Sequence, residues 1–311
     1  MKFSRRTLLQ TAVASGCTSL LHPVLASPSN SANAANLGFS LYGMKSVALT
    51  DSLRHCANIG YQHVELCLNE GYPTAPQVFH GEILEQTTSL LRELHLDVPC
   101  LMVLMKLTAD DAEHAAALQQ IRIAAEMALQ LDPVHPPLLE TVVGGRPALW
   151  EEQKAGMVRR LRDWAAAAEH AGVRIAIKAH VGSAMNSPER LLWMLEQVPS
   201  PALTAAYDFS HFELQGLDLE KTLVATLPRT SFIHVKDTIG DEQKFRFLLP
   251  GEGRTDYVRY FQLLQQHNYT GPVCVEVSGQ VFSQPGYDPL QAARTCWDVL
   301  STADARARGQ L

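Results

Sequence analysis

Short apolar segments alternate with longer amphipathic segments eight times after residue 36. The apolar segments are residues 37–42, 63–68, 98–104, 137–143, 174–179, 203–207, 232–236 and 273–277. Runs of this length are typical of buried strands, and the segments between them have the 3.6-residue spacing of helices. Parallel strands must be joined by crossovers, which helices usually supply. Eight such units without a break in composition predict one α/β domain, a single (β/α)8 TIM barrel over residues 37–311.

The competing architecture is an open, doubly wound sheet. That fold usually carries Gly-x-Gly-x-x-Gly after its first strand, where the glycines let the backbone approach a dinucleotide. The first predicted strand is followed instead by Tyr42-Gly43-Met44-Lys45. The sequence also contains no P-loop and no Gly-x-Ser-x-Gly motif. A closed barrel is therefore the preferred interpretation.

Residues 1–36 differ in composition from the rest of the chain. Arg5 and Arg6 precede a moderate apolar run and a stretch rich in Ser, Ala and Asn. This pattern resembles a twin-arginine export signal, with Val24-Leu25-Ala26 as its cleavage site, and a disordered basic tail is the alternative. Residues 14–17 also fit a loose lipoprotein box, which would place a lipid anchor on Cys17. The sequence thus predicts a signal peptide and linker over residues 1–36, export by the twin-arginine route and a periplasmic location.

Charge and cysteine usage exclude several classes of protein. Loss of residues 1–26 removes three basic residues and no acidic one, which changes the formal charge from −6 to −9. Nucleic acid is not expected as a partner, because proteins that bind its backbone are normally basic. No apolar run reaches the roughly 18 residues of a membrane span. The cysteines that remain are odd in number and lack a Cys-x-x-Cys pair, so we expect small core residues and not disulfides or a zinc site.

Polar residues gather at the ends of the predicted strands, where a barrel of this kind carries its chemistry. They are Glu65, Glu140, Lys178, His180, Asp208, His211, His234, Lys236, Asp237 and Glu276. Asp208, His234 and Glu276 end three successive strands, so a closed barrel brings two carboxylates and an imidazole together. Such carboxylates repel each other unless a cation lies between them. A divalent metal or an ammonium group is therefore expected at this point.

Five motifs follow one another along the predicted strands and loops. They are Gly60-Tyr61-x-x-Val64-Glu65-Leu66, Asp208-x-x-His211, His234-Val235-Lys236-Asp237, Pro250-Gly251-Glu252-Gly253 and Tyr269-x-Gly271-x-x-x-Val275-Glu276-Val277. Together they resemble the sugar phosphate isomerase/epimerase superfamily, the xylose isomerase-like barrels that also include metal-dependent abasic-site endonucleases. The resemblance extends from residue 37 to about residue 302. It implies a TIM barrel that acts on a small-molecule carbohydrate.

The resemblance also implies a metal site. In that superfamily a Glu, an Asp, a His and a Glu at four strand ends bind one divalent cation. Three of these match as Asp208, His234 and Glu276, which implies Mn, Mg, Co or Zn as the cofactor. The first glutamate does not match, because Lys178 stands at its position. The superfamily's usual reaction has one carboxylate remove a proton beside a carbonyl and a second return it, so this departure puts a two-carboxylate reaction in question.

Two interpretations of Lys178 stay open. In the first, the metal stays on the other three ligands, and Lys178 faces a substrate oxygen as an electrophile or, with a lowered pKa, acts as a base. In the second, the Lys178 ammonium itself fills the cation position between Asp208 and Glu276. An ammonium about 4 Å from a dication is repelled by roughly 8 kcal/mol at an effective dielectric constant near 20. The two acidic groups offset much of that repulsion.

The sequence therefore predicts an exported sugar isomerase/epimerase-like enzyme that transfers a proton α to a carbonyl with the help of a divalent metal. The predicted catalytic residues are Glu276, Lys178 and His211, and the predicted substrate-binding residues are His180, Lys236, Glu65 and Glu140. A keto-sugar glycoside lyase is one alternative, because it needs a single base. A non-catalytic carbohydrate-binding barrel, with Lys178 in place of the metal, is another. The acidic charge disfavours an endonuclease, and the sequence leaves a homo-oligomer open.

Overall fold

The structure, a computed structural model, describes residues 35–311 and contains a closed barrel of eight parallel strands. The strands are β1 (Asn36–Ser40), β2 (His63–Cys67), β3 (Asp97–Met102), β4 (Leu138–Val142), β5 (Ile175–Lys178), β6 (Leu203–Asp208), β7 (Thr230–Val235) and β10 (Pro272–Val275). Their order around the ring is β1-β10-β7-β6-β5-β4-β3-β2. The predicted (β/α)8 barrel is confirmed. The predicted twin-arginine signal and the lipid anchor fall outside the described residues and stay predictions.

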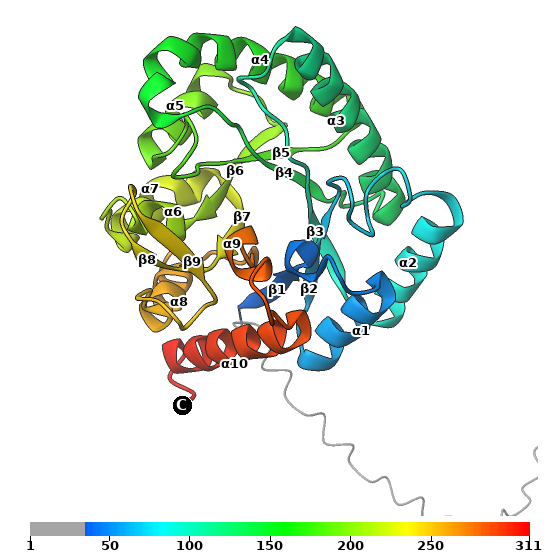
Figure 1. Cartoon of the computed structure of the whole chain (residues 1–311), viewed down its shortest axis with the longest axis vertical. Helices are drawn as coiled ribbons and strands as arrows, with labels where there is room; N and C mark the ends of the chain where they lie inside the picture. The colour runs from blue at the N-terminus through cyan, green and yellow to red at the C-terminus, as the bar shows by residue number, and fades with distance from the viewer. Residues whose placement is uncertain (1–34) are drawn as a thin grey trace, which may run out of the picture. The chain divides into compact units, whose positions relative to one another are not determined.

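Helices connect the strands and surround the barrel (Figure 1). They are α1 (Leu49–Ile59), α2 (Gly81–Glu93), α3 (Asp111–Leu131), α4 (Trp150–Ala171), α5 (Pro188–Gln197), α6 (Phe209–Glu213), α7 (Leu219–Thr226), α8 (Tyr257–Gln266), α9 (Gly279–Phe282) and α10 (Pro289–Ala307), with 3₁₀ turns η1 (Leu41–Met44), η2 (Pro147–Leu149) and η3 (Leu227–Arg229). Helix α1 ends at Gly60, whose φ of 119° lies in the left-handed region. A side chain there would collide with the Trp297 ring. None of the described helices is long and apolar enough to cross a membrane.

An antiparallel hairpin, which the sequence pattern did not indicate, follows the seventh barrel strand. Strands β8 (Asp237–Gly240) and β9 (Phe245–Leu248) pair with each other and lie outside the barrel sheet. The two Asp237 carboxylate oxygens accept hydrogen bonds from the backbone of the next loop, at Gly251, Gly253 and Thr255. This contact fixes where the loop leaves the hairpin. The hairpin was missed because its strands have only four residues each and include Asp, Gly and Arg.

The barrel interior changes from apolar to polar within two residues along five of the eight strands. Side chains at alternate positions of a strand point to the same face. One inward layer is apolar and consists of Cys100, Ala176, Ala206, Phe232 and Cys274, with Leu138 packed against it. The next inward residue is charged or polar on each of β4, β5, β6 and β7. The same holds for the residue just past the end of β10. The apolar layer therefore forms the floor of a polar site at the carboxyl ends of the strands.

The described cysteines are free and buried, as the sequence predicted. They are Cys56, Cys67, Cys100, Cys274 and Cys296. Burial raises the pKa of each thiol, to about 12 at Cys56 for instance. These residues therefore serve as small apolar side chains of the core.

Helix α3 begins with a capping box formed by Asp110 and Glu113, and this box can be tested by mutation. The Asp110 side chain accepts a hydrogen bond from the Glu113 backbone, and the Glu113 side chain accepts one from the Asp110 backbone. We expect Asp110→Ala to lower the free energy of unfolding by about 1 kcal/mol, because the Glu113 backbone N–H loses its acceptor. Urea unfolding of both proteins measures this. Glu126→Ala, at an exposed position within the same helix, is the control and should stay within about 0.5 kcal/mol of wild type; equal losses in the two variants would contradict the role of the cap.

Candidate active site

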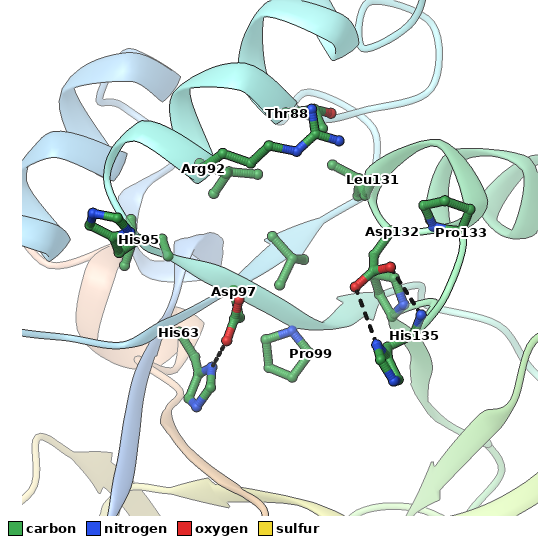
Figure 2. Close-up of a pocket in the computed structure, with 14 residues that line it drawn as sticks. His63, Thr88, Arg92, His95, Asp97, Pro99, Leu131, Asp132, Pro133 and His135 are labelled. Atoms are coloured by element: carbon green, nitrogen blue, oxygen red, sulfur yellow. Dashed lines mark hydrogen bonds and ion pairs between the residues drawn. The ribbon is translucent and has the colours of Figure 1, made fainter. Parts of the chain in front are cut away.

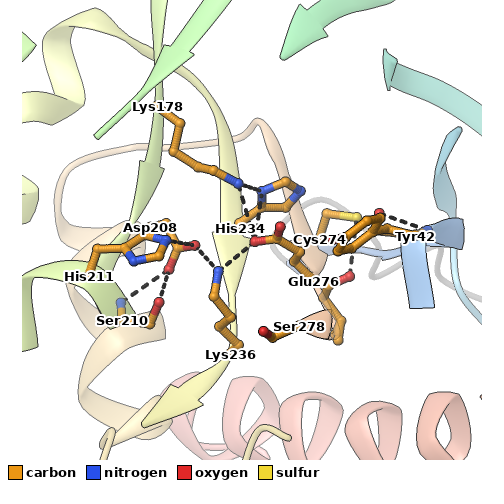
Figure 3. Close-up of polar contacts among 12 residues, drawn as sticks. Tyr42, Lys178, Asp208, Ser210, His211, His234, Lys236, Cys274, Glu276 and Ser278 are labelled. Carbon is orange, nitrogen blue, oxygen red and sulfur yellow. Dashed lines mark hydrogen bonds and ion pairs between the residues drawn. The ribbon is translucent and has the colours of Figure 1, made fainter. Parts of the chain in front are cut away.

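Seven ionisable side chains from six strands or their ends meet above the apolar floor. They are Glu65 from β2, Glu140 from β4, Lys178 from β5, Asp208 from β6, His234 and Lys236 from β7 and the residue after it, and Glu276 after β10. Figure 3 shows five of them, with Lys178 and Lys236 reaching toward Glu276 from different sides. Six of them are buried, and Glu276 is partly buried, with 12% of its side chain exposed. We call this set the polar layer.

Lys236 joins two of the carboxylates. Its Nζ donates hydrogen bonds to Asp208 Oδ2 and to Glu276 Oε2. Burial would raise the pKa of Asp208, but the Lys236 ammonium outweighs this and holds that pKa well below its usual range. Burial likewise opposes ionisation of Glu276, while Lys178 and Lys236 hold its pKa well below normal. Both carboxylates are therefore ionised at neutral pH.

Lys178 occupies the space between three further groups. Its Nζ lies 2.8 Å from His234 Nδ1, 3.2 Å from Glu276 Oε2 and 3.1 Å from Glu140 Oε1. Burial alone would lower the pKa of Lys178, yet Glu140 and Glu276 hold it well above the usual lysine value. Lys178 is thus an ammonium, and the interpretation of it as a base with a lowered pKa is wrong. The group that spans Asp208 and Glu276 is Lys236, whereas Lys178 spans Glu140 and Glu276.

His234 is held through both ring nitrogens. Its Nδ1 faces the Lys178 ammonium, and its Nε2 lies 3.0 Å from Glu65 Oε2. An ammonium has no lone pair, so His234 Nδ1 must be the acceptor and Nε2 must carry the ring proton that is donated to Glu65. Ser40 Oγ donates a further hydrogen bond to the same Glu65 oxygen. This arrangement fixes the His234 ring as a neutral tautomer.

Asp208 caps helix α6, and this cap positions His211. The Asp208 Oδ1 accepts hydrogen bonds from the backbone and side chain of Ser210. The third residue of the helix, His211, turns its Nε2 back to 3.3 Å from Asp208 Oδ2. Burial lowers the pKa of His211 to about 4 despite Asp208. The Asp-x-x-His motif therefore combines a helix cap with a neutral imidazole at the site.

A cavity of about 170 Å³ opens onto the polar layer. It is lined by Tyr42, Met102, Leu104, Glu140, Val142, Lys178, His180, His211, Lys236, Phe247, Glu276, Ser278 and Gly279. The His180 and His211 rings lie 4.1 Å apart, and burial holds the pKa of His180 well below its usual range. Phe247 of the hairpin packs edge-on against His211. Two neutral imidazoles and an aromatic ring thus form one wall beside the charged groups.

The predicted site residues fall into two groups. Glu140, Lys178, His180, His211, Lys236 and Glu276 line the cavity, whereas Glu65, Asp208 and His234 lie outside its lining and act through their partners. The sequence analysis missed Phe247, because the hairpin that carries it was not recognised. It also missed the contact of Glu140 with Lys178. This contact could have been predicted, because Glu140 and Lys178 lie at the ends of neighbouring predicted strands.

A larger hollow, of about 790 Å³, lies at the opposite, amino-terminal ends of β2 and β3 (Figure 2). Its polar groups form separate pairs: His63 Nδ1 is 3.9 Å from Asp97 Oδ2, and His135 Nδ1 is 3.9 Å from Asp132 Oδ2. Among the described residues, none of these belongs to a group with metal-ligand spacing. In TIM barrels the carboxyl ends of the strands carry the chemistry. The cavity at the polar layer is therefore the candidate active site.

The three predicted metal ligands come together, but their ligand atoms are already engaged. One oxygen each of Asp208 and Glu276 and a ring nitrogen of His234 lie within 4.8 Å of one another. Lys236 binds the two carboxylates, and Lys178 binds His234 and Glu276. A dication about 4 Å from either ammonium would be repelled by roughly 8 kcal/mol at an effective dielectric constant near 20. The side chains in this arrangement do not fit a divalent ion.

A second group with metal-ligand spacing, Glu65, His234 and Cys274, fits no better. Metal binding requires a thiolate. Burial holds the pKa of the Cys274 thiol well above its usual value, and Glu65 raises it further. His234 Nε2 is also committed to Glu65. Cys274 therefore serves as part of the apolar floor, and Glu65 and His234 bind each other above it.

Comparisons with known proteins agree with this fold. The family model described as "Xylose isomerase-like TIM barrel" matches residues 53–297. The L-ribulose-5-phosphate 3-epimerase UlaE of Shigella flexneri serotype 5b (strain 8401) is 23% identical over 252 residues, which cover 78% of this chain and 86% of that protein. The inosose dehydratase of Clostridium perfringens (strain ATCC 13124) is 22% identical over 150 residues, 43% of this chain and 50% of that protein.

Solved structures resemble the barrel at low sequence identity. The IolI protein with a binding zinc atom has a TM-score of 0.74 and 19% identity, over 88% of this chain and 99% of that one. The 3-keto-D-glucoside 4-epimerase YcjR of E. coli has a TM-score of 0.69 and 16% identity, over 86% of this chain and 99% of that one. At these identities the likeness concerns the fold alone.

The pairing of Lys236 with two buried carboxylates predicts a pH-dependent loss of stability on mutation. We expect Lys236→Met to lower the free energy of unfolding by about 3–5 kcal/mol at pH 7, because Asp208 and Glu276 lose a partner while buried. Their pKa values rise in the variant, so both groups become neutral as the pH falls, and the deficit shrinks. In wild type, the lowered pKa values give stability that is present above about pH 4 and is lost as the pH falls through the folded-state values.

Urea unfolding of both proteins at pH 7 and pH 4.5 measures the deficit. The control is Lys221→Met, an exposed lysine on α7, which should stay within about 0.5 kcal/mol of wild type at both pH values. A deficit that is equal at the two pH values would contradict the pairing.

Proposed function

The chain belongs to the xylose isomerase-like TIM barrel family, and on that premise we propose that it is a sugar isomerase/epimerase-like enzyme that moves a proton at a carbon beside a carbonyl group. The observation that carries the proposal is Glu276. Its carboxylate lies in the cavity lining, is the most exposed carboxylate of the polar layer, and contacts two ammonium groups. Proton removal α to a carbonyl needs an ionised base next to positive charge, because the product is an enediolate.

Each charged group of the cavity has a task in this reaction. Glu276 is ionised because its pKa lies well below the usual value, so it can accept a proton. Lys178 and Lys236 lie at the cavity, where their side-chain nitrogens can donate hydrogen bonds to the substrate oxygen that becomes negative. When substrate oxygens take over these hydrogen bonds, Glu276 loses part of its charge compensation. Its pKa then rises, which makes it a stronger base at the moment of proton transfer.

The neutral rings of the wall suit a sugar substrate. His180 Nδ1 accepts a hydrogen bond from the Gly182 backbone, so its Nε2 carries the proton and can donate to a hydroxyl group. His211 and Phe247 extend this wall. The two cavity lysines are each paired with two carboxylates, and the described lining contains no arginine. We therefore propose an uncharged keto-sugar as the substrate class and not a sugar phosphate.

The divalent metal predicted from the sequence has no step in this proposal. An ion on Asp208, His234 and Glu276 would require Lys236 to leave both carboxylates and Lys178 to leave His234. Two ammonium groups carry the same total charge as one dication. They can therefore neutralise the enediolate in its place. A solved relative is named for its zinc atom, and metal content is accordingly one of the tests below.

A lyase reaction on a keto-sugar is the second candidate. The similarity to inosose dehydratase supports it. An elimination begins with the same removal of an α proton and differs only in the loss of a group from the neighbouring carbon. Products of the exchange experiment below distinguish the two reactions, because a lyase yields an enone or its tautomer and an epimerase yields a second sugar.

Proton exchange with solvent tests the proposed function directly. Wild-type protein is incubated in D₂O with L-ribulose, D-tagatose, 2-keto-myo-inositol and a methyl 3-keto-D-glucoside, and mass spectrometry follows deuterium at the α carbon. We expect exchange in at least one of these compounds, and we expect Glu276→Gln to slow it by about 10²–10⁴-fold because the base is lost. Glu196→Gln, an exposed glutamate on α5, is the control. Exchange in none of the compounds with wild type would refute the proposal.

Metal analysis tests the role given to the lysines. We expect purified protein to contain no stoichiometric divalent cation and to keep its exchange activity after treatment with a chelator. Lys178→Glu supplies the carboxylate that the superfamily usually has at this position, and we expect this variant to gain affinity for Mn²⁺, Co²⁺ or Zn²⁺. A wild-type protein that loses activity with the chelator and regains it with one equivalent of metal would show that the lysines do not replace the ion.

A further inference from the structure

We propose that Glu140 is the second acid–base group of the site and exchanges a proton with the substrate from the side opposite Glu276. This inference rests on the proposed function and names the group that makes the reaction an epimerisation. The superfamily's usual carboxylate on the fifth strand is absent here, because Lys178 stands there. The neighbouring strand β4 places a carboxyl group against that lysine instead.

The barrel topology sets the two carboxyl groups on opposite sides of the cavity. In the ring order, β4 and β10 are separated by three strands in either direction. Glu140 lies on β4, and Glu276 directly follows β10. Both line the same cavity. An epimerase must remove a proton from one face of a carbon and return one to the other face, so acid–base groups from opposite sides meet the geometric requirement.

Among the described residues, Glu140 has a single ionic partner, Lys178. Its Oε1 is buried and makes no hydrogen bond with any described residue, and Lys178 Nζ lies 3.1 Å from it as an ion partner. Burial raises the pKa of Glu140, although Lys178 opposes this, whereas the pKa of Glu276 is held low. Environments that shift the pKa values of two carboxyl groups in one cavity in opposite directions are typical of an acid–base pair.

The proposed step balances in atoms and charge. The Glu276 carboxylate takes the α proton, so a C–H bond breaks, an O–H bond forms and the substrate becomes an enediolate. Lys178 passes an ammonium proton through the Glu140 carboxylate to the opposite face of the same carbon, which restores the carbonyl, forms the new C–H bond and leaves Lys178 as a neutral amine. Glu276 is then protonated and Glu140 is ionised. The Lys178 amine, which also contacts Glu276, then takes the proton from Glu276 and so restores the starting state of all three groups.

The contacts of Lys178 explain how a lysine at this position can support acid–base chemistry by Glu140 and Glu276. A lysine between the two carboxyl groups keeps one ionised and can pass a proton between them. The third contact of its Nζ, with His234 Nδ1, holds the amine in place. Because His234 is fixed by Glu65 on its other nitrogen, the lysine has a rigid acceptor.

Separate measurements of exchange and epimerisation test the inference. The probe is whichever of the four keto-sugars exchanges with wild type in D₂O, supplied as each of its two epimers. We expect Glu140→Gln to slow epimerisation by about 10²–10⁴-fold while the epimer that reacts with Glu276 still exchanges its α proton at a rate within about threefold of wild type. Glu276→Gln should slow exchange in the epimer that reacts with Glu276 by about 10²–10⁴-fold, as expected above, and should retain exchange only in the other epimer, whose α proton faces Glu140.

Three controls make the outcome decisive. Exchange that persists in Glu140→Gln itself proves a folded site, and thermal unfolding of each variant is measured in parallel. If Glu140→Gln does not fold, Glu140→Asp keeps the carboxyl group, and we expect it to epimerise more slowly than wild type but to exchange both epimers. Glu196→Gln should match wild type in both assays.

Two outcomes would overturn the role of Glu140 and leave the proposed function standing. One is epimerisation by folded Glu140→Gln at a rate within about threefold of wild type. The other is a wild-type protein that exchanges the α proton but forms no second epimer. Loss of exchange and epimerisation together in a folded Glu140→Gln would also refute it, because both steps would then depend on one group. Absence of exchange in wild type refutes the proposed function itself.

Discussion

Compensation of buried negative charge is the constraint on which the site depends. The barrel gathers Glu65, Glu140, Asp208 and Glu276 above an apolar floor, with almost no access for water. An unpaired buried carboxylate costs several kcal/mol even after the protein relaxes around it. Lys178 and Lys236 supply the positive charge, and each contacts two of the carboxylates. The other polar groups add hydrogen bonds to this framework.

The small side chains of the apolar floor leave room inside the closed barrel for the two long lysine side chains. Small side chains, Ala176 and Ala206, lie two residues before Lys178 and Asp208 on their strands. They leave space at the centre of the barrel, and Phe232 fills part of it. A lysine can therefore extend its apolar stem over the floor and hold its ammonium among the carboxylates. Local packing and charge compensation support each other.

The same charges are suited to the proposed reaction. An enediolate carries negative charge at the position where the two ammonium groups meet the cavity. In relatives with a metal, a dication can meet this need as a Lewis acid. A pair of lysines differs from an ion because the lysines also carry protons that can be exchanged. In the proposed reaction, Lys178 thus joins charge stabilisation to proton transfer between Glu140 and Glu276.

The sequence by itself determined the barrel, because eight repeats of buried strand and amphipathic helix leave few other ways to bury their apolar faces. It also determined that the carboxylates gather at one end, since parallel strands share that end. Only the tertiary structure decided which ammonium lies between which carboxylates. Lys236 reaches Asp208 and Glu276 while Lys178 turns to Glu140, a choice set by strand tilt, side-chain length and neighbouring packing, which act between strands distant in the sequence.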